Sequence, residues 1–334
     1  MTLFVEAPRG ADHENRKWDP TSLSEGPANP LAWANQSIII AAVGLAPDRW
    51  FGPAPWQMTS VNERSMTIDL EEFQHNGYLI LDVLAPVVLA RWRAAADAVM
   101  RQPRFAAKPQ FHYIPLLLPG NQDATLLDAL DHPLLIDSVS RILGGGPLLL
   151  DNAALLAAEP GVGYHQGWHR DVLQVPVDHI TDAMFSPQWR HNNVQLNLAL
   201  ADDDAFWAVP ASHQRPNTKG EEQAFGGSRH LAPESAVMPG GRRLHLLAGQ
   251  AALYHNNMIH RGYCDFTQPR RTLHIGYHSR QRPPTWHFYN FDDRALPAEH
   301  LASLPPGARR WMEGRLARRR QFPDVAPSYR GGFD

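Results

Sequence analysis

Two histidines and an aspartate in this sequence are spaced so that their side chains could bind one metal ion. His169 and Asp171 are two residues apart, and His260 lies much later in the chain. Side chains i and i+2 of a β-strand point to the same face, so His169 and Asp171 could bind one metal ion while Arg170 faces away. His260 on a neighbouring strand would complete a two-histidine, one-carboxylate set. Such a set leaves coordination positions open, as non-haem Fe(II) oxygenases require.

Other histidines compete for the third ligand position, and His255, five residues before His260, is the main alternative. The residues after His260 favour it over His255. Eleven positions after His260, Arg271 begins an apolar strand, and a buried arginine can hold a carboxylate in bidentate fashion. The adjacent Arg270 is turned to the opposite face by strand alternation. We therefore expect Arg271 to be the carboxylate anchor.

The elements around these residues change in type along the chain. Helical patterns occur at 69–73, 86–100 and 126–143, with a strand at 77–81, and the last helix stops at three glycines, 144–146. Short strands then occur at 148–150, 153–158, 169–175, 194–199, 206–209, 243–247, 251–255 and 272–278. This order predicts a mainly β protein with flanking helices, built as a jelly-roll (cupin-like) barrel.

Three regions are expected from the pattern. Residues 1–66 form an irregular arm rich in Pro, Gly and Trp, with a short helix or strand near 37–43. The arm either packs on the core as a loop-rich extension or acts as a lid or homodimer contact. Residues 67–300 form the barrel domain, in which the polar, Gly-rich segment 214–242 lies at the barrel mouth, where substrate contacts usually occur. Residues 301–334 form a basic helix with a solvated face, and then a tail.

Composition excludes several classes of protein. The 334 residues carry a formal net charge of −3, which argues against bulk attraction to nucleic acid. Cys264 is the single cysteine, so no intramolecular disulfide can form, which fits a reducing cytoplasm. The longest apolar run, 38–46, is much shorter than the roughly 20 residues that span a membrane. The expected partner is a small molecule in the cytoplasm.

Four segments in the same order resemble the phytanoyl-CoA dioxygenase-like family of Fe(II)/2-oxoglutarate oxygenases, over roughly residues 67–280. They are EFQHNGY at 72–78, WHRD at 168–171, FWAVPASH at 206–213, and His260 with Arg271 eleven residues later. Asp265 stands where the family often has Asn, and Ala211 replaces a usual Gly. Related halogenases lack the metal-binding carboxylate, so the presence of Asp171 disfavours halogenation.

The resemblance implies a double-stranded β-helix in which His169, Asp171 and His260 bind Fe(II). It implies that 2-oxoglutarate and O2 are co-substrates, and that the side chains near 2-oxoglutarate are Arg271, Asn152, Thr267 and Gln195. The apolar walls of the substrate pocket are then expected from Trp168, Phe185, Trp189 and Trp207.

The implied reaction is oxidation, most simply hydroxylation, of an unactivated C–H bond of a small organic molecule in specialised metabolism, with release of succinate and CO2. Two alternatives remain open. The chain could be a metal-binding jelly-roll protein without oxygenase activity, or a cupin-type zinc hydrolase or isomerase. Neither alternative has a need for the carboxylate anchor expected at Arg271.

Overall fold

The computed structural model describes residues 68–171, 192–228, 231–281, 288 and 296–322, and the structural statements concern these residues. The predicted arm at 1–66, two of the predicted pocket aromatics (Phe185 and Trp189) and the end of the tail lie outside them. Among the helices of the described ranges, none combines the length and apolar character that a membrane crossing requires.

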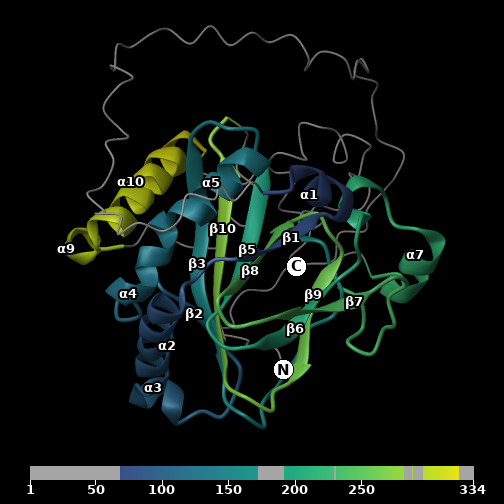
Figure 1. Cartoon of the computed structure of the whole chain (residues 1–334), viewed down its shortest axis with the longest axis horizontal. Coiled ribbons are helices and arrows are strands. Elements are labelled where there is room, and N and C mark those ends of the chain that lie inside the picture. Colours follow the sequence, from purple (N-terminus) through teal and green to yellow (C-terminus); the bar gives the residue numbers. More distant parts are fainter. Residues whose placement is uncertain (1–67, 172–191, 229–230, 282–287, 289–295, 323–334) are drawn as a thin grey trace, which may run out of the picture. The chain divides into compact units, whose positions relative to one another are not determined.

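Two antiparallel sheets form the centre of the structure (Figure 1). The six-stranded sheet has the order β1-β8-β5-β10-β3-β2. Its strands are β1 (Tyr78–Asp82), β2 (His112–Pro115), β3 (Leu148–Ala158), β5 (Asn193–Ala199), β8 (Gln250–His255) and β10 (Arg270–Ser279). The four-stranded sheet has the order β4-β9-β6-β7. Its strands are β4 (Gly163–His165), β6 (Asp203–Ala208), β7 (Arg242–Leu246) and β9 (His260–Asp265).

Helices cover one face of the six-stranded sheet (Figure 1). In chain order, the helices that precede β3 are α1 (Leu70–Asn76), α2 (Pro86–Met100), α3 (Pro103–Ala106), α4 (Ala124–Leu127), the 3-10 turn η1 (Asp128–Asp131) and α5 (Pro133–Ile142). The later ones are η5 (Ser212–Gln214), α7 (Lys219–Phe225), α9 (Ala298–Ser303) and α10 (Pro306–Gln321). The predicted mainly β architecture with flanking helices is confirmed.

The two faces of the six-stranded sheet differ in chemistry. One face carries apolar side chains such as Leu253 and Leu273, which pack against Trp92, Leu135 and Met312 of the helices in the main core. The opposite face looks toward the four-stranded sheet and carries polar side chains from three adjacent strands: Asn152, Gln195, Asn197, Thr272 and His274. The layer between the sheets therefore combines these polar side chains with a smaller apolar cluster that includes Phe206, Leu246 and Tyr254. The main apolar core lies under the helices.

Several element boundaries differ from the sequence-based prediction. The predicted helix 126–143 is divided into α4, η1 and α5 because Pro133 can begin a helix but cannot continue one. The two strands predicted at 148–150 and 153–158 are one strand, β3, with a register irregularity opposite Gly276 and Tyr277. The short strands β2, β4 and β9 were not predicted, and each is only three to six residues long.

The C-terminal basic helix exists, but the prediction that its arginines are solvated is wrong for two of them. Arg315 is fully buried and Arg319 is 9% exposed. The guanidinium of Arg315 donates to the backbone carbonyls of Leu150, Asp151 and Phe288. The guanidinium of Arg315 thus attaches α10 to β3, and the two buried arginines are not part of the positively charged surface of the helix.

Candidate metal centre

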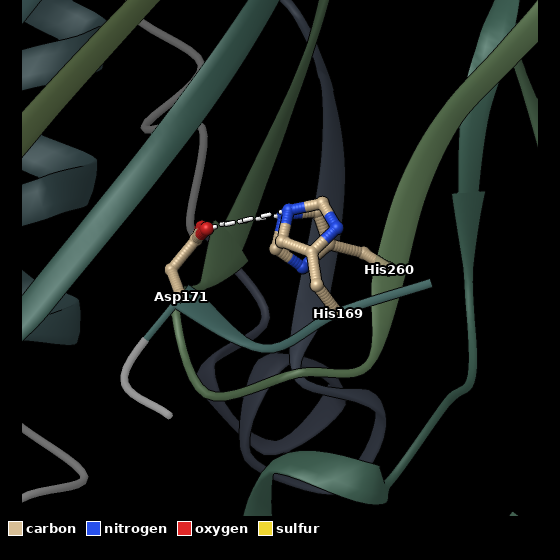
Figure 2. Close-up of side chains that lie close together, drawn as sticks. All are labelled: His169, Asp171 and His260. Atoms are coloured by element: carbon tan, nitrogen blue, oxygen red, sulfur yellow. Dashed lines mark ion pairs between the residues drawn. The ribbon is translucent and has the colours of Figure 1, made fainter. Parts of the chain in front are cut away.

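The three predicted metal ligands meet between the two sheets. One nitrogen of each histidine and one carboxylate oxygen of Asp171 all lie within 4.8 Å of one another, and this is the only such group among the described residues. Nε2 of His169 is 3.3 Å from Asp171 Oδ1, and Nε2 of His260 is 3.2 Å from Asp171 Oδ2. Figure 2 shows both imidazoles opposite the Asp171 carboxylate.

Backbone pairing brings the two histidines together. His169 and His260 form an isolated antiparallel bridge, with hydrogen bonds of 3.0 and 2.9 Å between their backbone groups. The backbone N–H of Asp171 donates to the carbonyl of Asn256, just before the β9 segment. The strand predicted at 169–175 is therefore only this bridge in its described part, and the residues after Asp171 lie outside the described ranges.

In each histidine, Nδ1 is hydrogen-bonded to the backbone carbonyl of the residue two positions earlier. Nδ1 of His169 lies 3.0 Å from the carbonyl of Gly167, and Nδ1 of His260 lies 2.8 Å from the carbonyl of Met258. A carbonyl only accepts, so in each ring Nδ1 carries the proton and Nε2 offers its lone pair. Burial by itself disfavours the charged His169, but the hydrogen bond and negative charge of Asp171 outweigh burial and raise the pKa of His169. The cluster is thus arranged to hold a cation.

His255 is excluded as the third ligand by its contacts. Its Nδ1 accepts a hydrogen bond of 2.9 Å from the backbone N–H of Asn257, and its ring lies 5.3 Å from the ring of His213. It forms part of the support beneath the turn before β9 and does not join the cluster.

Arg270 and Arg271 exchange the positions that the sequence predicted. Arg271 lies on the helix-facing side of β10, where its guanidinium pairs with Asp97 at 2.8 Å and Glu159 at 2.6 Å. Arg270 shares the opposite face with Thr272, and both contact the buried Asp203 of the four-stranded sheet. The expectation that Arg271 faces the metal ligands is therefore wrong. The apolar residues on the same face as Arg271, such as Leu273 and Ile275, pack under the helices, so the other face of β10 looks toward the four-stranded sheet.

Arg270 lies in a buried aromatic box formed by Phe111, Tyr164 and Phe266, with its guanidinium carbon 5.7 to 5.8 Å from each ring centre. The side chain is 2% exposed, yet its Nη1 has no hydrogen-bond partner in the described part of the chain. Leaving a buried guanidinium donor unpaired is costly, so this nitrogen fits an anionic group.

The charges of Asp171 and of Arg270 act on the same two tyrosines, Tyr254 and Tyr164. The pKa of Tyr254 is raised well above its usual value, first by burial and then by the negative charge of Asp171, while the positive charge of Arg270 opposes the rise. The pKa of Tyr164 is raised by burial, lowered in part by Arg270 and raised further by Asp171. Both phenols therefore lie within the fields of the carboxylate and of the guanidinium.

The remaining predicted contacts divide into two groups. Asn152 faces the cavity and donates to the hydroxyl of Tyr113 at 3.2 Å, and Gln195 faces the cavity and contacts Asp171. Thr267 is exposed in the turn between β9 and β10, so the structure does not bring it to the cluster. The sequence reasoning missed Tyr254 and Phe206, whose rings lie 5.1 and 6.2 Å from the ring of His260.

Trp168 and Trp207 lie on the outer face of the four-stranded sheet and do not line the cavity. Trp168 is 2% exposed and packs with Phe225 and Met238 from the 214–242 segment. The guanidinium of Arg261 stacks over both tryptophans, 4.6 and 5.1 Å from the rings. Strand alternation explains the correction, because His169 and Phe206 occupy the cavity face and their neighbours must point outward.

Arg170, between His169 and Asp171 in the sequence, is buried and holds several segments together. It donates to the backbone carbonyls of Ser212, Arg215 and Asn257 and to Oδ1 of Asn217. Burial lowers its pKa to about 9, so it keeps its charge at neutral pH. The guanidinium thereby joins the metal-binding segment to η5 and to the turn that leads into His260.

Replacing Arg170 with methionine is expected to lower the free energy of unfolding by about 3 kcal/mol or more, because it leaves several buried carbonyls without a donor. Urea denaturation would measure this loss. The matched control is Arg243→Met, whose guanidinium stacks over Trp207 near the surface, and which should cost about 1 kcal/mol or less. Equal midpoints for the two variants would contradict the role given to Arg170.

Comparison with known proteins supports the fold. No protein-family model and no curated protein sequence matches the chain. Among solved structures, HygX from Streptomyces hygroscopicus with nickel and 2-oxoglutarate bound has a TM-score of 0.51 and 16% identity, over 63% of this chain and 86% of that one. The epimerase SnoN, in complex with Fe3+, alpha ketoglutarate and nogalamycin RO, has a TM-score of 0.49 and 18% identity, over 69% and 89% of the two chains.

AviO1 from Streptomyces viridochromogenes Tue57 has a TM-score of 0.47 and 20% identity, over 66% of this chain and 99% of that one. At 16% identity the likeness to HygX concerns the fold alone, and it agrees with the two antiparallel sheets and flanking helices of this chain. The chain therefore has the jelly-roll fold that it shares with HygX.

Proposed function

We propose that this chain is an Fe(II)/2-oxoglutarate-dependent oxygenase that acts on a small organic molecule. The observation that carries the proposal is that the layer between the two sheets has two complementary ends. At one end His169, Asp171 and His260 present their ligand atoms to a common point. At the other end, the buried Nη1 of Arg270 has no hydrogen-bond partner among the described residues. A metal and a dicarboxylate would satisfy both ends.

The donor set fits iron. Two neutral imidazoles and one carboxylate are the ligands of the facial triad, which leaves coordination positions for a chelating co-substrate and for O2. The backbone carbonyls of Gly167 and Met258 fix both imidazoles with Nε2 toward the metal position. When bound, the metal would activate O2, which is the oxidant. Oxidative decarboxylation of 2-oxoglutarate to succinate and CO2 would supply two of its electrons, and the C–H bond of the substrate would supply the other two.

Arg270 fits the distal carboxylate of 2-oxoglutarate better than Arg271. Its Nε already pairs with Asp203 at 2.9 Å, which fixes the guanidinium and leaves the Nη1 side available. The aromatic box around it excludes water and so strengthens a charge-assisted hydrogen bond. We propose Asn152 as a further polar contact of the co-substrate, since its Oδ1, on the cavity face of β3, is buried without a partner among the described residues.

Two aromatic side chains next to His260 would also contribute to the reaction. Phe206 and Tyr254 form an apolar wall beside His260, which helps keep water from the reacting centre. Hydroxylation in specialised metabolism, and membership of the phytanoyl-CoA dioxygenase-like family, remain parts of this proposal. They are supported by the order of the sequence motifs and by the intact Asp171.

The proposal is tested by titrating the metal-free protein with Fe(II) and 2-oxoglutarate without oxygen. We expect the weak visible charge-transfer band of iron-chelated 2-oxoglutarate to appear with both components and with neither alone. Succinate release on admission of O2 would then allow candidate substrates to be screened. Iron binding without the band would overturn the 2-oxoglutarate assignment and favour a metal-binding protein without oxygenase activity or a hydrolase.

A further inference from the structure

We propose that Gln195 and Tyr254 form a hydrogen-bonded clamp that orients the Asp171 carboxylate for the metal, and that they act as positioning residues. The inference rests on the proposed metal site and extends it to two residues that touch neither metal nor substrate in this scheme. It replaces the expectation that Gln195 contacts 2-oxoglutarate.

The clamp is a continuous chain of two hydrogen bonds. Nε2 of Gln195 donates to Oδ2 of Asp171 at 2.6 Å, and the hydroxyl of Tyr254 donates to Oε1 of Gln195 at 3.0 Å. Gln195 is 1% exposed and Tyr254 is 2% exposed. An ionised carboxylate only accepts hydrogen bonds, so Gln195 must present its amide nitrogen to Asp171 and its oxygen to Tyr254. Each member of the chain therefore fixes the orientation of the next.

The clamp connects the two sheets at the metal site. Gln195 and Tyr254 are opposite each other in the register of β5 and β8, two central strands of the six-stranded sheet. Two of the three ligands belong to the other side of the cavity, because His260 begins β9 of the four-stranded sheet and His169 is bridged to it. Gln195 therefore holds the carboxylate from the side of the six-stranded sheet.

Tyr254 also contacts a second ligand directly. Its ring lies 5.1 Å from the ring of His260 and 4.6 Å from the ring of Phe206. One tyrosine thus restrains His260 by packing and Asp171 through Gln195. Residues behind metal ligands typically change metal affinity by about 10- to 100-fold when they are replaced, and a residue that restrains two ligands should lie within this range.

The test uses Co(II) alone as the probe, added to the full-length protein without oxygen, because the visible bands of Co(II) report the geometry of its ligands. We expect Gln195→Met to raise the Kd for Co(II) about 10- to 100-fold. Tyr254→Phe keeps the ring that packs on His260 and loses only the hydrogen bond to Gln195, so its effect should lie at or below the lower end of this range, about 3- to 10-fold. In both variants the visible bands should shift in position or intensity. Tyr254→Phe changes a single hydroxyl, so it keeps the test valid if Gln195→Met does not fold.

Tyr277→Phe is the matched control. Tyr277 is fully buried, and its hydroxyl donates to the carbonyl of Leu130 at 3.2 Å on the helix-facing side of β10. Removal of the Tyr277 hydroxyl should lower the melting temperature about as much as Tyr254→Phe does, and it should leave the Co(II) affinity and the Co(II) spectrum unchanged.

Three results would overturn the clamp, and they are distinguishable. If the wild type binds Co(II) and both Tyr254→Phe and Gln195→Met match it, the clamp is wrong while the metal site stands. If Tyr254→Phe and Tyr277→Phe weaken Co(II) binding equally, the effect is a general loss of stability and the clamp is again wrong. If the wild type does not bind Co(II), the proposed metal site itself fails, and the clamp fails with it.

Discussion

Arg270→Leu is expected to raise the Kd for 2-oxoglutarate by about 100-fold, whereas Arg271→Leu should leave it within about twofold. Removing one member of a buried, hydrogen-bonded charge pair costs about 3 kcal/mol, which corresponds to about two powers of ten in Kd. Arg270 faces the cavity with an Nη1 that has no partner in the described ranges. Arg271 is already neutralised by Asp97 and Glu159 on the opposite face of β10.

The measurement is a titration of the Fe(II)-loaded protein with 2-oxoglutarate, without oxygen, monitored by the charge-transfer band. Arg270→Leu removes the cationic partner of the buried Asp203 and is expected to destabilise the protein, so Arg270→Lys is measured beside it. Lysine keeps the charge near Asp203 but lacks the planar fork, and we expect about a tenfold rise in Kd. A large effect of Arg271→Leu with none from either Arg270 variant would restore Arg271 as the anchor.

His260→Ala is expected to abolish tight Fe(II) binding, whereas His255→Ala should change the Kd for Fe(II) by no more than about twofold. His260 is one of the three residues whose ligand atoms converge. His255 uses its Nδ1 to accept from the backbone of Asn257 and packs on His213. Loss of one of the three proposed protein ligands leaves two, which is too few to hold the facial set.

Fe(II) binding is measured by competition with a coloured chelator under nitrogen, with thermal melting of each variant recorded in parallel. His255→Ala should lower the melting temperature, because an acceptor for a buried backbone N–H is lost. His260→Ala should retain the fold, because its main contribution is to the metal. If His255→Ala removed iron binding and His260→Ala did not, the ligand assignment would be wrong.

Strand alternation alone could not predict which arginine, Arg270 or Arg271, is placed to bind a carboxylate. Alternation correctly separates Arg270 from Arg271, yet it does not say which of the two faces is the cavity. The apolar partners Leu273, Ile275 and Tyr277 suggested an interior face, and they are interior, but in the core beneath the helices. Which face meets the other sheet depends on how the sheets and helices pack, and this is a property of the tertiary structure.

Two of the four predicted pocket aromatics, Trp168 and Trp207, are placed elsewhere for a related reason. Trp168 and Trp207 were expected in the pocket because large apolar side chains often line substrate sites. Their neighbours His169 and Phe206 take the cavity face, and the 214–242 segment covers the outer face and gives the tryptophans a core of their own. The sequence does not show that this segment folds back over the sheet.

The class of fold, and the grouping of His169, Asp171 and His260, could be predicted from the amino-acid sequence alone. The spacing of His169 and Asp171 is local, and the order of helices and strands depends on hydrophobic periodicity, so both can be found without tertiary contacts. The partners that come from distant strands could not be predicted in this way: Arg270 beside Asp203, and Tyr254 and Gln195 behind Asp171. Each of these contacts joins segments far apart in the chain, and their side chains meet only because two sheets pack face to face.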